Sequence, residues 1–379
     1  MTADNANPYL HLAAPAIAGL APYEPGRPAA EVEREFGLTD VIKLASNENP
    51  AGPSPSVQVA LTDAAKNLGR YPDGAGFALR NALAAHLHVS PEQITLGNGS
   101  NDILVLLAET FLTPQHTAVY DQYSFVVYRL AVQGTGAAAR VAPSNPPDHA
   151  QPFGHDLEAM RKQIDERCRL VFIANPNNPT GTWLEQDSLH GFLGSLPDSV
   201  IVVLDEAYLE YARQDGDADT AAWLGEFPNL VIVRTFSKAY GLASLRVGFS
   251  ISSVGIAELL NRVRQPFNVN TVAQAAALAA LDDQEWLARG VAANESGMHQ
   301  VSSGLALLGL SSVPSRGNFL LVHFGSADTA AACNAYLLQH GIIVRPVANY
   351  GLPAYLRITI GTPEENSRLL AALKAFAER

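Results

Sequence analysis

The chain has 379 residues, of which 47% are hydrophobic and 16% are charged, so it has enough apolar material for a large core and no sign of disorder. At roughly 150 residues per domain, this length suggests about two domains. The 25 basic and 37 acidic residues give a net charge of −12, which argues against an unaided electrostatic grip on DNA, RNA or an anionic membrane. Any bound phosphate must therefore be held by a local group of residues.

Cysteine content and the N-terminal sequence narrow the class of protein further. Two cysteines, Cys168 and Cys333, are too few for a disulfide scaffold or a cysteine-rich metal site. No Lys or Arg precedes Arg27, and no apolar stretch approaches the roughly 18 residues of a membrane span. His86 and His88 lie two positions apart on a predicted helix and cannot face one metal ion. We expect a cytoplasmic protein with no metal, no nucleic-acid partner and no membrane partner.

The predicted elements begin after a Pro- and Ala-rich segment that ends near residue 45. A helical pattern over Val57–Leu68 is followed by the turn Arg70–Gly74. Short apolar runs then alternate with helix-length segments such as Asn101–Phe111 and Trp183–Leu196. These runs predict strands at Ile94–Leu96, Ala118–Tyr120, Arg140–Val141, Leu170–Ala174, Val200–Leu204, Leu230–Arg234 and Val247–Ile251. Beyond a predicted helix over Thr271–Leu281, a second set of strands comprises Phe319–Phe324, Ile342–Val344 and Leu356–Ile360.

Short strands that are apolar on both faces and separated by helices predict a mostly parallel sheet covered on both sides. We therefore expect an α/β fold with a large α/β domain over residues 46–270 and a smaller α+β domain over residues 271–379. The N-terminal segment, residues 1–45, is expected to join the smaller domain.

Polar residues directly follow three of the predicted strands, where ligands bind in open α/β sheets. The turn Asn175–Gly181 follows the first of these strands, Asp205-Glu206-Ala207-Tyr208 ends the second, and Thr235-Phe236-Ser237-Lys238 ends the third. Singly, these are ordinary features: a turn, a helix cap and a surface lysine. Lys238 is followed by Ala239-Tyr240-Gly241-Leu242-Ala243 and does not lie on a charged face. A lysine in such a setting can have a depressed pKa and act as an amine nucleophile toward a carbonyl.

Together, the three motifs carry a resemblance. Asn-Pro-x-Asn-Pro-Thr-Gly, then Asp-Glu-Ala-Tyr, then Ser-Lys with Arg246 eight positions later resembles the fold-type I pyridoxal-phosphate aminotransferases. The finer similarity is to the histidinol-phosphate aminotransferase family, and it runs in order from about residue 17 to the C-terminus. The motifs that carry it are Tyr23–Gly26, Lys43–Pro50, Arg70–Asp73, Gly97–Ser100, Gly341–Arg345 and Leu356–Gly361.

The resemblance implies catalytic and cofactor-binding roles for residues of the large domain. Lys238 would bond to the aldehyde of pyridoxal 5'-phosphate and later move a proton between the substrate α-carbon and C4′ of the cofactor. Asp205 would keep the pyridine nitrogen protonated, so that the ring can accept electrons. Asn178 and Tyr208 would hydrogen-bond the phenolic oxygen, and Tyr123 would stack on the ring.

The cofactor phosphate would be held by residues from several loops and from a second subunit. Ser100 and Asn101 follow a Gly-rich turn and open a predicted helix, so their backbone N–H groups suit an anion. The resemblance adds Thr235, Ser237 and Arg246 as further phosphate ligands. It also places Tyr71 at the phosphate of the neighbouring subunit, which implies a homodimer with shared active sites.

For the substrates, the resemblance implies that Arg357 grips the carboxylate of the amino-acid partner, helped by Arg345 and Tyr23, with Asn47 at the entrance. Histidinol phosphate has no carboxylate, so Arg357 would bind its phosphate and then the carboxylate of the 2-oxo acid. The implied reaction transfers the amino group of L-histidinol phosphate to 2-oxoglutarate, giving imidazole-acetol phosphate and L-glutamate in histidine biosynthesis. Phe267 is a departure, because family members often have a tyrosine there.

Three alternatives stay open at this point. The missing hydroxyl at Phe267 weakens the case for histidinol phosphate over a neutral aromatic amino acid, phenylalanine or tyrosine, as the amino donor. Related enzymes on the same fold decarboxylate an amino-acid phosphate such as threonine phosphate. A non-catalytic protein that keeps the fold is disfavoured by the presence of Lys238, Asp205 and Arg246.

Overall fold

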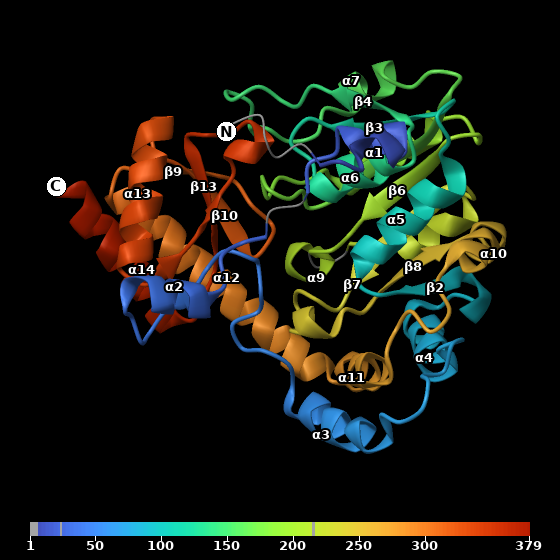
Figure 1. Ribbon diagram of the computed structural model, residues 1–379, viewed down its shortest axis with the longest axis horizontal. Helices are drawn as coiled ribbons and strands as arrows, with labels where there is room; N and C mark the ends of the chain where they lie inside the picture. The colour runs from blue at the N-terminus through green and yellow to red at the C-terminus, as the bar shows by residue number, and fades with distance from the viewer. Residues whose placement is uncertain (1–6, 23–24, 214–216) are drawn as a thin grey trace.

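A seven-stranded sheet forms the centre of the computed structural model, which describes residues 7–22, 25–213 and 217–379 (Figure 1). The strand order is β2-β8-β7-β6-β5-β3-β4. β8 is antiparallel to both of its neighbours, and the other neighbouring strands are parallel, which confirms the mostly parallel sheet predicted from the sequence. The strands are β2 (Ile94–Gly97), β3 (Thr117–Asp121), β4 (Ala138–Ala142), β5 (Cys168–Ala174), β6 (Ile201–Asp205), β7 (Leu230–Thr235) and β8 (Gly248–Ser252).

Both faces of this sheet are buried, because alternate side chains of the central strands point into two separate apolar clusters. Val171 and Ile173 of β5 belong to one cluster, and Leu170 and Phe172 belong to the other. The first face is covered by α3 (Pro55–Ala64), α4 (Phe77–Leu87), α7 (Leu157–Lys162), α8 (Gln186–Gly194) and α11 (Thr271–Asp282). The second face is covered by α5 (Ser100–Phe111), α6 (Val126–Gly134) and α10 (Val254–Val263).

A second, smaller assembly of strands and helices lies beside the large sheet and is coloured orange to red in Figure 1. Its four-stranded antiparallel sheet has the order β12-β13-β10-β9. The short strand β1 pairs in parallel with β11, so a segment near residue 43 joins the C-terminal part of the chain. The division at residues 45 and 270 stays a prediction. The elements are β1 (Ile42–Lys43), α12 (Gln284–Leu307), β9 (Ser311–Val313), β10 (Phe319–His323), α13 (Ala327–Gln339), β11 (Ile342–Ile343), β12 (Arg345–Pro346), β13 (Tyr355–Thr359) and α14 (Pro363–Ala377).

Some predicted boundaries differ from the structure. The helix expected over Trp183–Leu196 begins only at Gln186, because the backbone N–H groups of Trp183 and Leu184 donate to side chains of other loops. The strand expected over Ile342–Val344 ends at Ile343 as β11, and the next strand, β12, belongs to a different sheet. The remaining helices are α1 (Pro15–Ala18), α2 (Ala29–Phe36) and α9 (Leu209–Ala212). Among the described residues, no helix is long and apolar enough to cross a membrane.

Candidate active site

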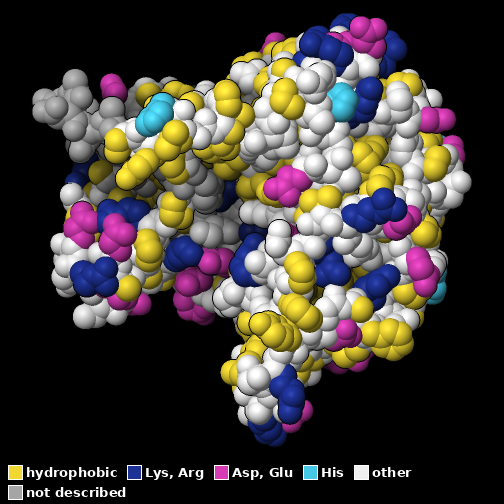
Figure 2. All heavy atoms as spheres, turned by 45° about the vertical axis from the view of Figure 1, so that its right-hand side comes forward, with side chains coloured by type: hydrophobic (Ala, Val, Ile, Leu, Met, Phe, Trp, Pro, Cys, Tyr) yellow, Lys and Arg dark blue, Asp and Glu magenta, His cyan; other side chains and the backbone are white. Residues whose placement is uncertain are grey.

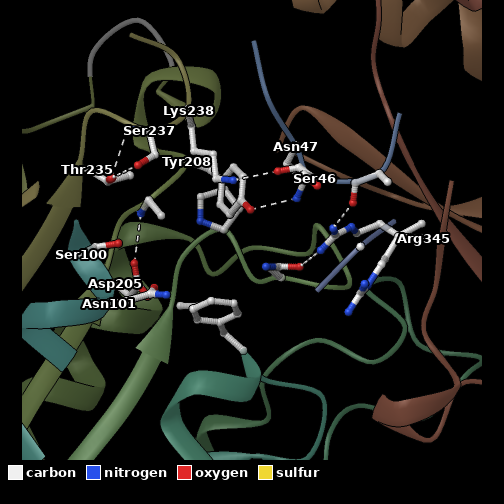
Figure 3. Close-up of a pocket in the computed structure, with 18 of the residues that line it drawn as sticks. Ser46, Asn47, Ser100, Asn101, Asp205, Tyr208, Thr235, Ser237, Lys238 and Arg345 are labelled. Carbon is white, nitrogen blue, oxygen red and sulfur yellow. Dashed lines mark hydrogen bonds between the residues drawn. The ribbon is translucent and has the colours of Figure 1, made fainter. Parts of the chain in front are cut away.

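A cavity of about 180 Å³ lies beyond the carboxyl ends of β5, β6 and β7 and beside the start of α5 (Figure 3). Parallel strands deliver their C-terminal residues to this edge of the sheet, so side chains far apart in the sequence meet there. The predicted site residues that line the cavity are Asn47, Ser100, Asn101, Asn178, Asp205, Tyr208, Thr235, Ser237, Lys238, Arg246, Arg345 and Arg357.

Lys238 presents its amine to the middle of the cavity. Its Nζ donates a hydrogen bond of 3.0 Å to the backbone carbonyl of Ser46 and lies 5.7 Å from the centre of the Tyr208 ring. Burial lowers the pKa of Lys238 to about 7, and the nearby Arg357 guanidinium acts in the same direction. A substantial fraction of this amine is therefore uncharged near neutral pH and able to attack a carbonyl.

Asp205 ends β6 and is buried at the base of the cavity. The Tyr128 hydroxyl donates to Asp205 Oδ2 at 2.8 Å, and the backbone N–H of Ala207 donates to Oδ1 at 3.2 Å. Burial raises the pKa of Asp205 to about 6, although both hydrogen bonds favour the ionised form and oppose that shift. The carboxylate is thus mostly ionised at neutral pH and can pair with a protonated ring nitrogen.

Tyr128 is a supporting residue that sequence reasoning missed. Its side chain is fully buried and stacks on Phe172 with the ring centres 4.9 Å apart. Burial and the adjacent Asp205 carboxylate raise the pKa of Tyr128 well above its ordinary value, so the hydroxyl stays a donor. A tyrosine within the otherwise apolar face of a helix is the signal that could have found it.

An anion cradle forms where α5 begins. Ser100 starts this 12-residue helix, so free backbone N–H groups face the cavity near Arg246, Thr235 and Ser237. Arg246 Nη1 lies 3.3 Å from Ser237 Oγ, and the Thr235 hydroxyl donates to the same oxygen at 3.0 Å. Gly99 has a φ of 83°, and a Cβ there would lie 2.4 Å from Arg246 Nη2. Only glycine allows this close approach between the turn and the guanidinium.

Two separate hydrogen bonds each join a predicted ring-binding residue to a predicted substrate-binding residue. Asn47 Nδ2 donates to the Tyr208 hydroxyl at 2.9 Å, and burial raises the pKa of Tyr208 to about 12. Arg357 donates to Asn178 Oδ1 and, at 2.7 Å, to the carbonyl of Ala45. Because Asn178 Oδ1 is used in this way, its amide NH2 is left to donate to an oxygen in the cavity.

Two arginines meet at the end of the cavity formed by the smaller sheet. Arg345 on β12 is directly paired with Arg357 on β13, and both line the cavity. Figure 3 shows Arg345 on the opposite side of the cavity from Ser100 and Asn101. Two guanidinium groups in one place suit a carboxylate or phosphate on the substrate.

Two predicted residues, Tyr123 and Tyr71, do not line the cavity. Tyr123 packs edge-on against Phe153 with ring centres 5.3 Å apart, and Phe125, two positions later, lines the cavity instead. The Tyr71 side chain is 83% exposed and does not line the described cavity of its own chain. Tyr23 lies outside the described residues.

The donor set fits pyridoxal phosphate, the cofactor implied by the sequence resemblance. Lys238 offers an amine for its aldehyde, Asp205 a carboxylate for its ring nitrogen, and the α5 cradle a site for its phosphate. The cradle is specific, because a Cβ on Gly99 would fill it. Within residues 7–22, 25–213 and 217–379, no group of three or more His, Cys, Asp or Glu side chains could hold a metal ion.

Comparison with known proteins agrees with this geometry. The family described as "Aminotransferase class I and II" matches residues 39–373. A histidinol-phosphate aminotransferase 2 of Pseudomonas fluorescens (strain Pf0-1) is 52% identical over 98% of this chain and 99% of its own. A histidinol-phosphate aminotransferase of Methylobacillus flagellatus is 53% identical over 94% of this chain and 95% of its own.

A solved structure shows the same fold. The histidinol-phosphate aminotransferase of Sinorhizobium meliloti, in complex with pyridoxal-5'-phosphate, superposes with a TM-score of 0.87 at 31% identity. The match covers 96% of this chain and 97% of that one. The chain therefore belongs to the class I and II aminotransferases and, within them, to the histidinol-phosphate aminotransferase family.

Proposed function

We propose that this chain is a pyridoxal-phosphate-dependent aminotransferase of histidine biosynthesis. It would transfer the amino group of L-histidinol phosphate to 2-oxoglutarate, giving imidazole-acetol phosphate and L-glutamate. The observation that carries the proposal is the arrangement of one cavity: an amine of lowered pKa lies between an anion cradle and a pair of arginines. The relatives that are about half identical over nearly the whole chain bear histidinol-phosphate aminotransferase names.

The cofactor, when bound, supplies a carbonyl carbon that accepts the amino group and a ring that takes up electrons. Ser100, Thr235, Ser237 and Arg246 would bind its phosphate, and Asp205 would hold a proton at the ring nitrogen. We assign ring stacking to Phe125 in place of Tyr123, because Phe125 lines the cavity.

Lys238 is the residue that moves the reacting proton. With its amine free, Lys238 Nζ would accept the proton from the substrate α-carbon and later give it back, while the bound cofactor would supply the electron sink. A pKa of about 7 suits both halves of this transfer, because the amine exists in both protonation states near neutral pH.

Arg345 and Arg357 orient the substrate from the opposite end. They would bind the phosphate of L-histidinol phosphate in one half-reaction and a carboxylate of L-glutamate or 2-oxoglutarate in the other. Their positive charge is local, since the whole chain carries a net charge of −12. Asn47, Tyr208 and Tyr23 complete the proposed substrate and cofactor contacts.

The proposal includes a cytoplasmic homodimer whose two active sites are shared. Large apolar side chains are exposed on the surface near the start of α4: Tyr71 is 83% exposed, Phe77 72% and Phe267 44%. Figure 2 shows hydrophobic side chains on the lower part of the molecule, where Figure 1 places α3 and α4. Exposed apolar patches mark interaction sites, and a second copy presenting Tyr71 to the neighbouring phosphate would cover this one.

Cys168 and Cys333 are both free and buried, in keeping with a reducing compartment.

A half-reaction measurement tests the substrate. The purified protein loaded with pyridoxal phosphate is mixed separately with L-histidinol phosphate, L-glutamate and L-phenylalanine, and the loss of its yellow absorbance is followed. We expect rapid bleaching by the first two donors, slow bleaching by phenylalanine and none for Lys238→Ala. Faster bleaching by phenylalanine would move the substrate to the aromatic amino acids, and undiminished turnover of Lys238→Ala would refute the mechanism.

A further inference from the structure

Two aromatic rings stack on the protein surface near the start of α4. The Tyr71 and Phe267 rings have centres 4.8 Å apart and planes inclined by 19°. Both side chains are substantially exposed, although Tyr71 and Phe267 are nearly 200 positions apart in the sequence. A ring that reaches into solvent ordinarily samples several rotamers, so a second ring stacked on it restricts its orientation.

Hydrogen bonds within the loop that carries Tyr71, and from residues before and after Phe267 in the sequence, fix its conformation. The Asp73 side chain accepts from the backbone N–H groups of Ala75 at 2.9 Å and Phe77 at 2.7 Å, which fixes the turn before α4. Arg264 Nη2 donates to the Gly74 carbonyl at 3.0 Å, and Gln274 Nε2 donates to the Asp73 carbonyl at 3.0 Å. The loop is therefore rigid although its tip is exposed.

The Phe267 ring packs directly onto this loop. A Cβ added at Gly74 would lie 3.2 Å from two carbons of the Phe267 ring, so glycine permits the contact. Phe267 itself has a φ of 57°, a left-handed conformation that is costly for a bulky residue and that persists where the surroundings enforce it.

The next residue ties Phe267 to the anion cradle of its own subunit. Asn268 Nδ2 donates to the Leu96 carbonyl at 3.0 Å and to Asp102 Oδ2 at 2.9 Å. Asp102 Oδ2 also accepts from the backbone N–H of Asn98 in the turn before α5. The stacked pair is thus mounted on the same framework as the cradle.

We propose that Phe267 is a positioning residue for Tyr71. Its ring holds the Tyr71 phenol in one orientation, so that the hydroxyl meets the cofactor phosphate bound by a second copy of the chain without first having to be ordered. The inference rests on the proposed function, which places Tyr71 at the phosphate of the neighbouring subunit. This role needs only an aromatic ring, so a phenylalanine, which lacks a hydroxyl, can fill it at position 267.

Cofactor affinity of the full-length dimer tests the proposal, with pyridoxal 5'-phosphate and phosphate-free pyridoxal compared as probes. We expect Phe267→Ala to weaken pyridoxal phosphate binding about fivefold, because the Tyr71 side chain must then be ordered on binding. Binding of pyridoxal, which has no phosphate, should be unchanged. Phe267→Tyr keeps the ring and should retain the affinity. In a Tyr71→Phe background, Phe267→Ala should cause no further loss, because the hydroxyl it positions is gone.

Sedimentation of each variant accompanies the binding measurements, and Phe77→Ala is the control for loss of an exposed ring outside the stack. Equal weakening of pyridoxal, an additional loss in the Tyr71→Phe background, or dissociation of Phe267→Ala into monomers would each overturn the proposal. If Phe267→Ala does not fold, Phe267→Leu, which keeps apolar bulk without a ring, carries the same comparison. Weaker binding by Tyr71→Phe but not by Phe267→Ala would overturn this inference alone. If Tyr71→Phe forms an intact dimer and binds pyridoxal phosphate as tightly as the unmodified chain, the proposed role of Tyr71 itself is refuted.

Discussion

Lys238 is a buried amine whose charge depends on pH in the neutral range. Its pKa is lowered to about 7. Below that pH the amine is mostly protonated and cannot attack a carbonyl, and above it the amine is mostly uncharged and reactive. We predict that the rate at which cofactor-free protein bonds to added pyridoxal phosphate rises between about pH 6 and 8 and then levels off. Stopped-flow absorbance measures this rate. A rate that keeps rising toward pH 10, the range in which an unperturbed lysine titrates, would contradict the lowered pKa.

Burial raises the pKa of Asp205, and one hydrogen bond from Tyr128 opposes that rise. Its hydroxyl stabilises the ionised carboxylate, so removing it in Tyr128→Phe raises the pKa of Asp205 further above its present value of about 6. We predict that the acid limb of the kcat/KM profile moves to higher pH, by roughly one unit for a hydrogen bond of this kind. Tyr120→Phe, another buried tyrosine, is the control and should leave the limb in place. An unchanged profile for Tyr128→Phe would show that the hydrogen bond does not set this pKa.

At the scale of elements, a buried ion network joins β6 and β7 behind the cavity. Arg234 Nε donates to Glu206 Oε2 at 2.8 Å, and its Nη2 donates to Asp219 Oδ1 at 2.7 Å. Both carboxylates raise the pKa of Arg234, whereas its burial acts in the opposite direction. Because Thr235 follows Arg234 directly, the network also fixes the start of the loop that carries Lys238.

We predict that Arg234→Ala lowers the free energy of unfolding by about 3–5 kcal/mol, because it leaves Glu206 buried without its cation. Urea unfolding of the cofactor-free protein measures the change. The control is Arg262→Ala, which removes an exposed ion pair with Glu258 and should cost less than about 0.5 kcal/mol. Similar losses for both variants would show that burial gives the network no special weight.

The strands of the large sheet and the residues that follow them could be predicted from the sequence. Apolar, β-branched runs identified the strands of the large sheet, and residues directly after β5, β6 and β7 do converge on one cavity. Parallel topology makes that convergence predictable without coordinates. The Tyr128–Asp205 hydrogen bond was not predicted, since it joins residues 77 positions apart through tertiary packing.

The conformation of the loop between β3 and α6 could not be predicted from the sequence. Tyr123 and Phe125 are aromatic residues two positions apart, and only the path of the chain decides which of them faces the cavity. The Asp121 carboxylate accepts from the Tyr123 N–H, and Asn177 Nδ2 donates to the Tyr123 carbonyl at 3.0 Å. These contacts fix the backbone before α6, and they depend on partners that no local pattern reveals.

For the whole molecule, the proposed role of Tyr71 requires two chains to complete each active site. Tyr71 lies on the surface, away from the described cavity of its chain, whereas Lys238 lies within it. If Tyr71 reaches the phosphate of a second copy, the two residues of one active site come from different chains. Two chains with different defects can then combine to form one intact site.

We predict that a mixture of Lys238→Ala and Tyr71→Glu chains regains activity that neither has alone. Tyr71→Glu places a negative charge beside the phosphate, and it should fold because Tyr71 is exposed. After dissociation and random reassociation, half of the dimers are hybrids, each with one intact and one doubly defective site, so about a quarter of the wild-type activity should return. Unmixed chains taken through the same treatment are the control. If Tyr71 instead acted within its own chain, every site in the hybrid would keep one defect, and mixing would restore nothing.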